Sequence, residues 1–147
     1  MNEWSFNEKS LLGSMLAMTF TAAFYFEEVM AMLAAGNSDT GDIAVLAIVA
    51  VIIMIIIEAV YHAIIAQGDG QATRDERDLA IRMRGATLEK LALEAGVIGV
   101  IGHIAIASLF APESVDLFLV GNLLIAVLVI ASLAGRGREL WHYRRGL

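Results

Sequence analysis

Four long apolar stretches alternate with short polar segments along the chain, at residues 11–35, 43–66, 88–110 and 115–134. Each stretch is long enough to cross the ~30 Å hydrocarbon core of a bilayer as a helix. The segments between them are rich in glycine, asparagine and aspartate or contain the single proline, and such residues end helices. The pattern therefore predicts an all-α integral membrane protein with four transmembrane helices, a single membrane domain over residues 1–147.

The polar segment that follows the second apolar stretch has the signature of a helix start. Thr73 and Glu76 fit a capping box, in which each side chain serves a free backbone amide of the other residue. Arg74 with Asp78, and Asp78 with Arg82, are i,i+4 partners of opposite charge. We therefore expect a cytoplasmic helix over residues 74–87, which continues into the third span or bends before it.

Arginine and lysine are concentrated at two places. The segment before the third span contains Arg74, Arg77, Arg82, Arg84 and Lys90, and the C-terminal segment contains Arg136, Arg138, Arg144 and Arg145. The loops between spans one and two, and between spans three and four, contain neither residue type. By the positive-inside rule both termini are cytoplasmic. The short external loops then predict two antiparallel helical hairpins.

Ionisable and amide side chains interrupt the spans at two depths. Counted at ~1.5 Å per residue, both levels lie roughly 10 Å or less from a membrane surface. The inner level consists of Glu58, His62 and Glu94, and the outer level of Glu28, His103 and Asn122. Ionisable groups inside a span are costly, so these two levels are the candidate ion or proton sites.

In the inner level, Glu58 and His62 are four positions apart and share a helix face. Together with Glu94 they offer imidazole and carboxylate ligands suited to a divalent metal ion. Proton transfer is the other chemistry, because a carboxylate near a histidine in a dry environment titrates close to neutral pH. A purely structural reading is equally open, with these carboxylates paired to His62 or to arginines of the 74–84 segment.

In the outer level, Glu28 continues a helical stripe with Thr21 and Tyr25, which favours it over Glu27 as the inward residue. A single His103 or Asn122 in a span serves more often as a hydrogen bond between helices than as a ligand. The outer residues therefore carry the weaker functional prediction.

Composition excludes several classes of function. Hydrophobic residues make up 59% of the chain and the formal net charge is −6, so nothing supports binding to nucleic acid. Cysteine is absent, which rules out thiolate metal sites, iron–sulfur clusters and cysteine nucleophiles in this chain. A bis-histidine haem is disfavoured because His62 and His103 are expected in opposite leaflets and His142 outside the membrane. No hydrolase, zincin, P-loop or dinucleotide motif occurs, so the sequence gives no signal for an enzyme.

The motif Asp75-Glu76-Arg77-Asp78, with Ile81 after it, resembles a family of uncharacterised small prokaryotic membrane proteins. That family has a DERD motif in the cytoplasmic loop between two pairs of spans. The resemblance implies a protein of the prokaryotic cytoplasmic membrane and no particular reaction. Physically, the charges of the motif can pair with one another at a helix start, which would order the joint between the hairpins. A conformational or partner-binding role for this joint is a hypothesis.

Two functions remain in view. The leading hypothesis is proton- or cation-linked transport or channel activity through the two polar levels. The alternative is a non-catalytic membrane scaffold or regulatory subunit, whose cytoplasmic helix and basic tail bind a membrane or cytoplasmic protein partner. In either case we expect a homo-oligomer in the lipid bilayer, because polar and glycine-rich faces exceed what one thin bundle buries.

Overall fold

The computed structural model describes residues 4–68, 76–112 and 115–145. Four helices account for nearly all of them: α1 (Phe6–Ala34), α2 (Thr40–Gly68), α3 (Glu76–Phe110) and α4 (Leu117–Arg145). Each is long and apolar enough to cross a membrane. The prediction of an all-α chain with four candidate membrane spans is confirmed.

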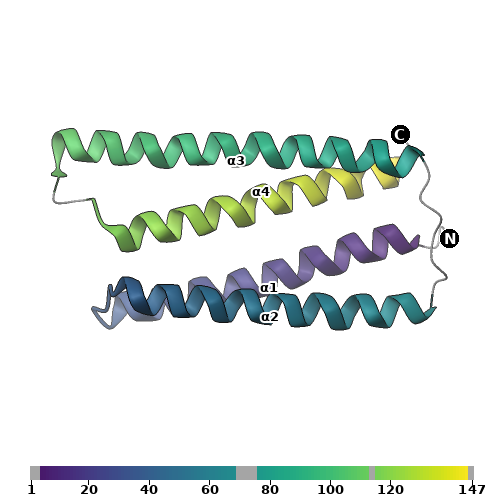
Figure 1. Cartoon of the computed structure of the whole chain (residues 1–147), viewed down its shortest axis with the longest axis horizontal. Coiled ribbons are helices and arrows are strands. Elements are labelled where there is room, and N and C mark those ends of the chain that lie inside the picture. The colour runs from purple at the N-terminus through teal and green to yellow at the C-terminus, as the bar shows by residue number, and fades with distance from the viewer. Residues whose placement is uncertain (1–3, 69–75, 113–114, 146–147) are drawn as a thin grey trace.

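Three helices extend beyond the predicted spans at the end where the two termini lie (Figure 1). Helix α1 starts at Phe6 because Ser5 and Glu8 form a capping box, with the Ser5 amide 2.8 Å from Glu8 Oε2. The predicted cytoplasmic helix is the first part of α3, which runs as one helix into the span. Helix α4 continues to Arg145, since the basic segment contains no proline to stop it. The capping box predicted at Thr73 lies outside the described residues.

The helices lie in the spatial order α3, α4, α1, α2, with α4 and α1 in the middle (Figure 1). Helix α3 packs along α4, α2 packs along α1, and α1 and α4 contact each other. Within the described ranges, no Cα atom of α2 lies within 8 Å of one in α3. The chain is therefore an open array in which α2 and α3 are the outer helices.

Glycines bring α3 and α4 close together. A Cβ atom added at Gly135 would lie 2.8 Å from Glu89 Cβ and 3.1 Å from the Gly85 carbonyl oxygen. One added at Gly96 would meet Val127 of α4 in the same way. Small residues permit this contact between backbones, as they do at many helix contacts in membranes.

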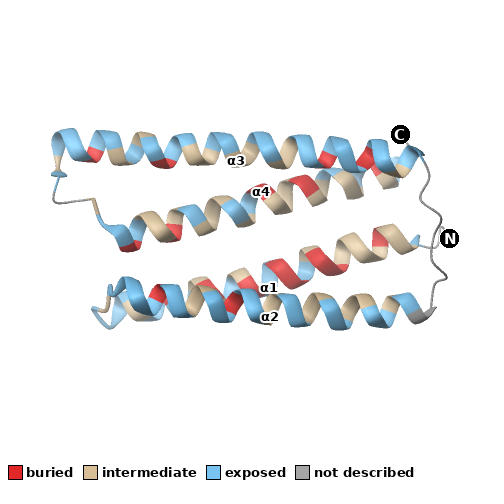
Figure 2. Ribbon diagram, viewed as in Figure 1, coloured by how far each residue is buried: buried red, intermediate tan, exposed pale blue. Residues whose placement is uncertain are grey.

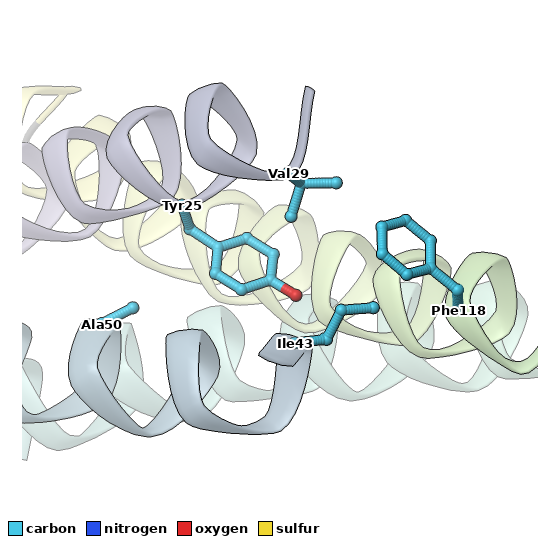
Figure 3. Packing of buried hydrophobic residues seen from close by; sticks show 5 residues of the cluster. All are labelled: Tyr25, Val29, Ile43, Ala50 and Phe118. Atoms are coloured by element: carbon cyan, nitrogen blue, oxygen red, sulfur yellow. The ribbon is translucent and has the colours of Figure 1, made fainter. Parts of the chain in front are cut away.

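A hydrophobic cluster closes the end opposite the termini. Its buried members are Tyr25, Val29, Ile43, Ala50 and Phe118, drawn from α1, α2 and α4 (Figure 3). By contrast, large apolar side chains on the outer helices are exposed, among them Ile52 at 50% and Ile98 at 69% (Figure 2). Apolar exposure of this extent suits a surface that faces lipid.

Candidate functional site

Glu58 forms an ion pair that joins α2 to α4. Its Oε1 atom accepts a hydrogen bond from Arg136 Nη1 at 2.9 Å, and both side chains are about one-quarter exposed, at 26% and 28%. An ionised carboxylate is stabilised in a membrane when a charged partner satisfies it. The structural reading of Glu58 is therefore the one its contacts support, with an arginine from α4 and not from the 74–84 segment.

His62 lies against α1 and not against another ligand. The Ser10 hydroxyl is 3.5 Å from Nδ1 and the Ser14 hydroxyl is 3.5 Å from Nε2. The neighbouring Tyr61 hydroxyl donates to the Lys9 carbonyl oxygen at 2.8 Å. These contacts fix the C-terminal half of α2 on α1, with both nitrogens of the imidazole next to hydroxyl groups.

Glu94 does not join Glu58 and His62. It lies on α3, which does not approach α2, and it pairs with Lys90 at 3.6 Å on a surface where its own side chain is 53% exposed. No group of three or more histidine, aspartate or glutamate side chains that could hold a metal ion occurs in the part of the chain that the structure describes. The predicted inner metal cluster is thus not assembled within one chain.

The three residues of the predicted outer level do not come together either. Asn122 is buried, accepts a hydrogen bond from the Tyr25 hydroxyl at 3.0 Å, and donates to the Phe118 carbonyl oxygen at 2.8 Å. Glu28 and His103 are exposed, so neither lies with Asn122 in a shared site. The prediction that Glu28 is the inward residue of its stripe is not met, because Tyr25 and Val29 take the buried positions of that helical face.

The DERD motif lies at the start of α3. Asp75 is outside the described residues, Glu76 and Arg77 are exposed, and Asp78 accepts a hydrogen bond from the Asn7 side-chain amide at 3.0 Å. Asp78 thereby connects the first turns of α1 and α3. This contact ties the joint to the N-terminal helix, a pairing that sequence spacing does not reveal.

A polar cavity of about 310 Å³ opens between α1, α3 and α4 at this same end. Its charged and polar lining consists of Asn7, Ser10, Ser14, Arg82, Glu89, Arg136, Glu139 and Tyr143. At its inner boundary the Ser132 hydroxyl donates to Glu89 Oε1 at 2.7 Å. Two guanidinium groups therefore face two carboxylates around the cavity, and Arg136 also holds Glu58.

A second cavity, of about 250 Å³, lies deeper between α1, α2 and α4. Its lining is almost entirely apolar, with alanine, methionine, valine and leucine side chains around Tyr25. The Thr21 hydroxyl also lines it and has no hydrogen-bond partner among the described residues. Ser132 lines this cavity too, so the Ser132–Glu89 hydrogen bond marks the boundary between the apolar and the polar cavity.

Arg136, Glu89 and Glu139 are the residues of this region that sequence reasoning missed. All three lie toward the ends of α3 and α4 that are near the chain termini (Figure 1), where the hydropathy pattern places a membrane boundary and a basic tail. The available signal was the lack of any helix breaker stronger than glycine between Ala134 and Arg145. A helix that continues through this segment places Arg136 level with Glu58 of α2.

Comparison of the chain with protein-family models, with curated proteins and with solved structures finds no match.

Proposed function

We propose that the chain is an integral protein of a prokaryotic cytoplasmic membrane, with α1/α2 and α3/α4 as two antiparallel hairpins and both termini in the cytoplasm. The arginines of the described residues support this orientation, because all lie in the terminal part of α3 or α4 that is near the chain termini (Figure 1). The chain has no cysteine, so a single introduced cysteine is the only thiol that a reagent can label. A membrane-impermeant thiol reagent should label Ser38→Cys from outside and Ser5→Cys only after permeabilisation; the reverse pattern would overturn the orientation.

Within that membrane, the protein acts as a non-catalytic scaffold or regulatory subunit whose cytoplasmic end binds a protein partner. The observation that carries this proposal is that three pairs of polar side chains in or near the spans join one helix to another. Glu58 pairs with Arg136, Glu89 accepts from Ser132, and Tyr25 bonds Asn122. Groups that hold helices together in this way supply structure, and among the described residues no ligand set for a metal ion is assembled.

The first turns of α3 offer the surface for such a partner. Leu79 and Met83 are four positions apart on one helix face and are 62% and 63% exposed. In the proposed orientation they precede the third span, so lipid tails do not cover them. Arg77 is exposed in the same turn as Leu79 and adds a charge that can set partner orientation.

Photo-crosslinking in native membranes tests this proposal. A photoreactive amino acid at Leu79 or Met83 should form an adduct with one protein band, and Arg77→Glu should reduce that adduct. The matched control is the same amino acid at Ile98, which is 69% exposed at span level on the same helix and should label lipid. Equal labelling at all three positions, or lipid adducts alone, would overturn the partner-binding role.

The polar cavity favours a second candidate, the proton- or cation-linked activity, now centred on different residues. Glu89 and Glu139 face Arg82 and Arg136 around about 310 Å³ of space at the cytoplasmic end. Carboxylates beside arginines inside a membrane recur in ion and proton pathways. In proteoliposomes with a pH gradient, this candidate predicts proton flux that falls in Glu139→Gln and persists in Glu76→Gln. Flux no higher than that of protein-free vesicles would exclude this candidate, and the scaffold function would be the one that remains.

A further inference from the structure

Two unpaired arginines from neighbouring helices line a shallow hollow on the side of the α3/α4 pair. Arg84 and Arg138 line it together with Thr87, Leu88 and Leu91, around about 200 Å³. Neither guanidinium has an ion pair or a hydrogen bond within the described part of the chain, whereas Arg136 and Arg144 are both paired with glutamates. The residues that line the hollow include no carboxylate, so its charge is positive and uncompensated.

A buried histidine lies within range of the charges of these two arginines. His142 is only 3% exposed, and neither of its ring nitrogens has a hydrogen-bond partner among the described residues. It lies one turn after Arg138 on α4. Burial lowers the pKa of His142, and the charges of Arg84 and Arg138 lower it further. Two fixed cations side by side suit an anion that has several acceptor oxygens, and a phosphate group is the biological anion of that kind.

The hollow continues into an apolar track along α3. Positions 84, 88, 91, 95 and 99 recur at helical spacing on one side of the helix. Leu91, Ala95 and Gly99 are exposed, and a Cβ atom added at Gly99 would meet nothing within 4 Å. From position 84 to position 99 the track rises ~22 Å, which exceeds the ~15 Å thickness of one hydrocarbon leaflet. One acyl chain can therefore lie along it.

The neighbouring aromatic residue places the two arginines at headgroup level. Trp141, one turn from Arg138, is 46% exposed, and the Arg145 guanidinium lies over its ring at 4.5 Å. Tryptophan and arginine together at the end of a span are typical of the membrane–water interface. The cations thus lie where lipid phosphates are, and the apolar track lies where acyl chains are.

We propose that Arg84 and Arg138 bind the phosphate of an anionic phospholipid of the cytoplasmic leaflet, with one acyl chain on the Leu88–Gly99 track. The source of the phosphate is a lipid and not a free anion, because the track extends the positive hollow into the hydrocarbon region. The inference rests on the proposed membrane orientation. It requires neither a protein partner nor ion transport, and it assigns these arginines a role distinct from general attraction to a charged surface.

Lipid affinity measured on the purified, detergent-solubilised full chain tests the site. Phosphatidylglycerol should bind the wild-type protein, as counted by native mass spectrometry, and raise its melting temperature, while phosphatidylcholine should do neither. Arg84→Gln and Arg138→Gln should each weaken phosphatidylglycerol binding about fivefold, and the double variant more than tenfold. Lys90→Gln is the matched control, because it removes one charge from another face of α3 and should leave affinity within twofold.

Two further arms separate the sources of the phosphate. Ala95→Phe fills the track about 16 Å from position 84 without a change in charge, and the protein can fold because Ala95 is exposed; the substitution should weaken phosphatidylglycerol binding severalfold. Inorganic phosphate at millimolar concentration should give no stabilisation. If phosphate stabilises the protein as well as the lipid does, the site takes a free anion and the lipid proposal is wrong. If Lys90→Gln loses as much lipid affinity as the arginine variants do, general surface charge explains the binding and the proposed site is wrong.

These outcomes are independent of the partner and flux experiments. Reversed thiol labelling would overturn the orientation and assign the lipid to the other leaflet, even with the affinities as expected. Normal labelling with unchanged lipid affinity in the arginine double variant would overturn the lipid site and leave the orientation standing.

Discussion

The two ends of the molecule are held together by different forces. At the end opposite the termini, Tyr25, Val29, Ile43 and Phe118 pack into an apolar cluster that contains one hydrogen bond between side chains, from Tyr25 to Asn122. At the end with the termini, ion pairs and polar contacts join all four helices around a polar cavity. Shape complementarity rigidifies the first end, whereas the second depends on charges that water and salt can reach. The second end is therefore the part of the molecule where binding and conformational change are most easily accommodated.

Removal of the largest buried side chain should have the greatest effect. Tyr25 is 2% exposed, so Tyr25→Ala leaves a cavity in the apolar cluster and should lower the free energy of unfolding by about 3 kcal/mol or more. Unfolding of the detergent-solubilised protein by SDS, followed by circular dichroism, measures this. Phe20→Ala on the same helix is the control, since Phe20 is 64% exposed and its removal should cost less than about 0.5 kcal/mol. Similar losses in both variants would mean that this cluster does not stabilise the fold.

The contact between α3 and α4 should come next in size, and it gives opposite signs at two glycines. A methyl group at Gly135 would lie 2.8 Å from Glu89 Cβ, so Gly135→Ala should lower stability by about 1–3 kcal/mol. A methyl group at Gly121 on the same helix would meet nothing within 4 Å, so Gly121→Ala should leave stability unchanged or raise it by up to ~1 kcal/mol. The same SDS titration decides between them. A loss at Gly121 as large as that at Gly135 would trace the effect to helix flexibility instead of helix contact.

The Glu58–Arg136 ion pair should contribute less than either packing contact. Both side chains are about one-quarter exposed, so screening reduces their attraction, and a double-mutant cycle with Glu58→Gln and Arg136→Gln should give a coupling of about 1 kcal/mol. The coupling should weaken as salt is added, because water reaches this end. Lys90 and Glu94 form the control pair; their side chains are 74% and 53% exposed, and their coupling should not exceed ~0.5 kcal/mol. If the coupling of Glu58 and Arg136 is no larger than that of the control pair, the ion pair does not stabilise the contact between α2 and α4.

The sequence predicts the helices of this molecule better than their contacts, and Glu58 shows why. Hydropathy is a local property, so the apolar run that precedes Glu58 identifies α2 to within a few residues at each end. The partner of Glu58 depends on which helices are neighbours and how each is rotated, which no local pattern contains. Glu94 lies on a helix that packs elsewhere, and Arg136 lies beyond the predicted end of its span.

The same limit applies to Tyr25 at the other end. A tyrosine within an apolar run resembles any other large side chain, while the adjacent glutamates attract functional interest because charges in a span are costly. In the structure Tyr25 is buried and Glu28 is exposed. Depth along a helix, which sequence supplies, therefore has to be combined with direction around it before a polar residue can be assigned a role.

The Tyr25–Asn122 hydrogen bond should give the smallest effect, and it tests the contrast between the two ends most directly. A cycle with Tyr25→Phe and Asn122→Leu should give a coupling of about 0.6 kcal/mol, the usual size for a hydrogen bond between membrane helices. Part of the Asn122 bonding survives in Tyr25→Phe, because its amide still donates to the Phe118 carbonyl oxygen at 2.8 Å. Water does not reach this buried pair, so its coupling should be independent of salt, unlike that of Glu58 and Arg136. If the Tyr25–Asn122 coupling instead exceeded that of the ion pair, a polar contact would dominate the apolar end, and the division of forces between the two ends would be wrong.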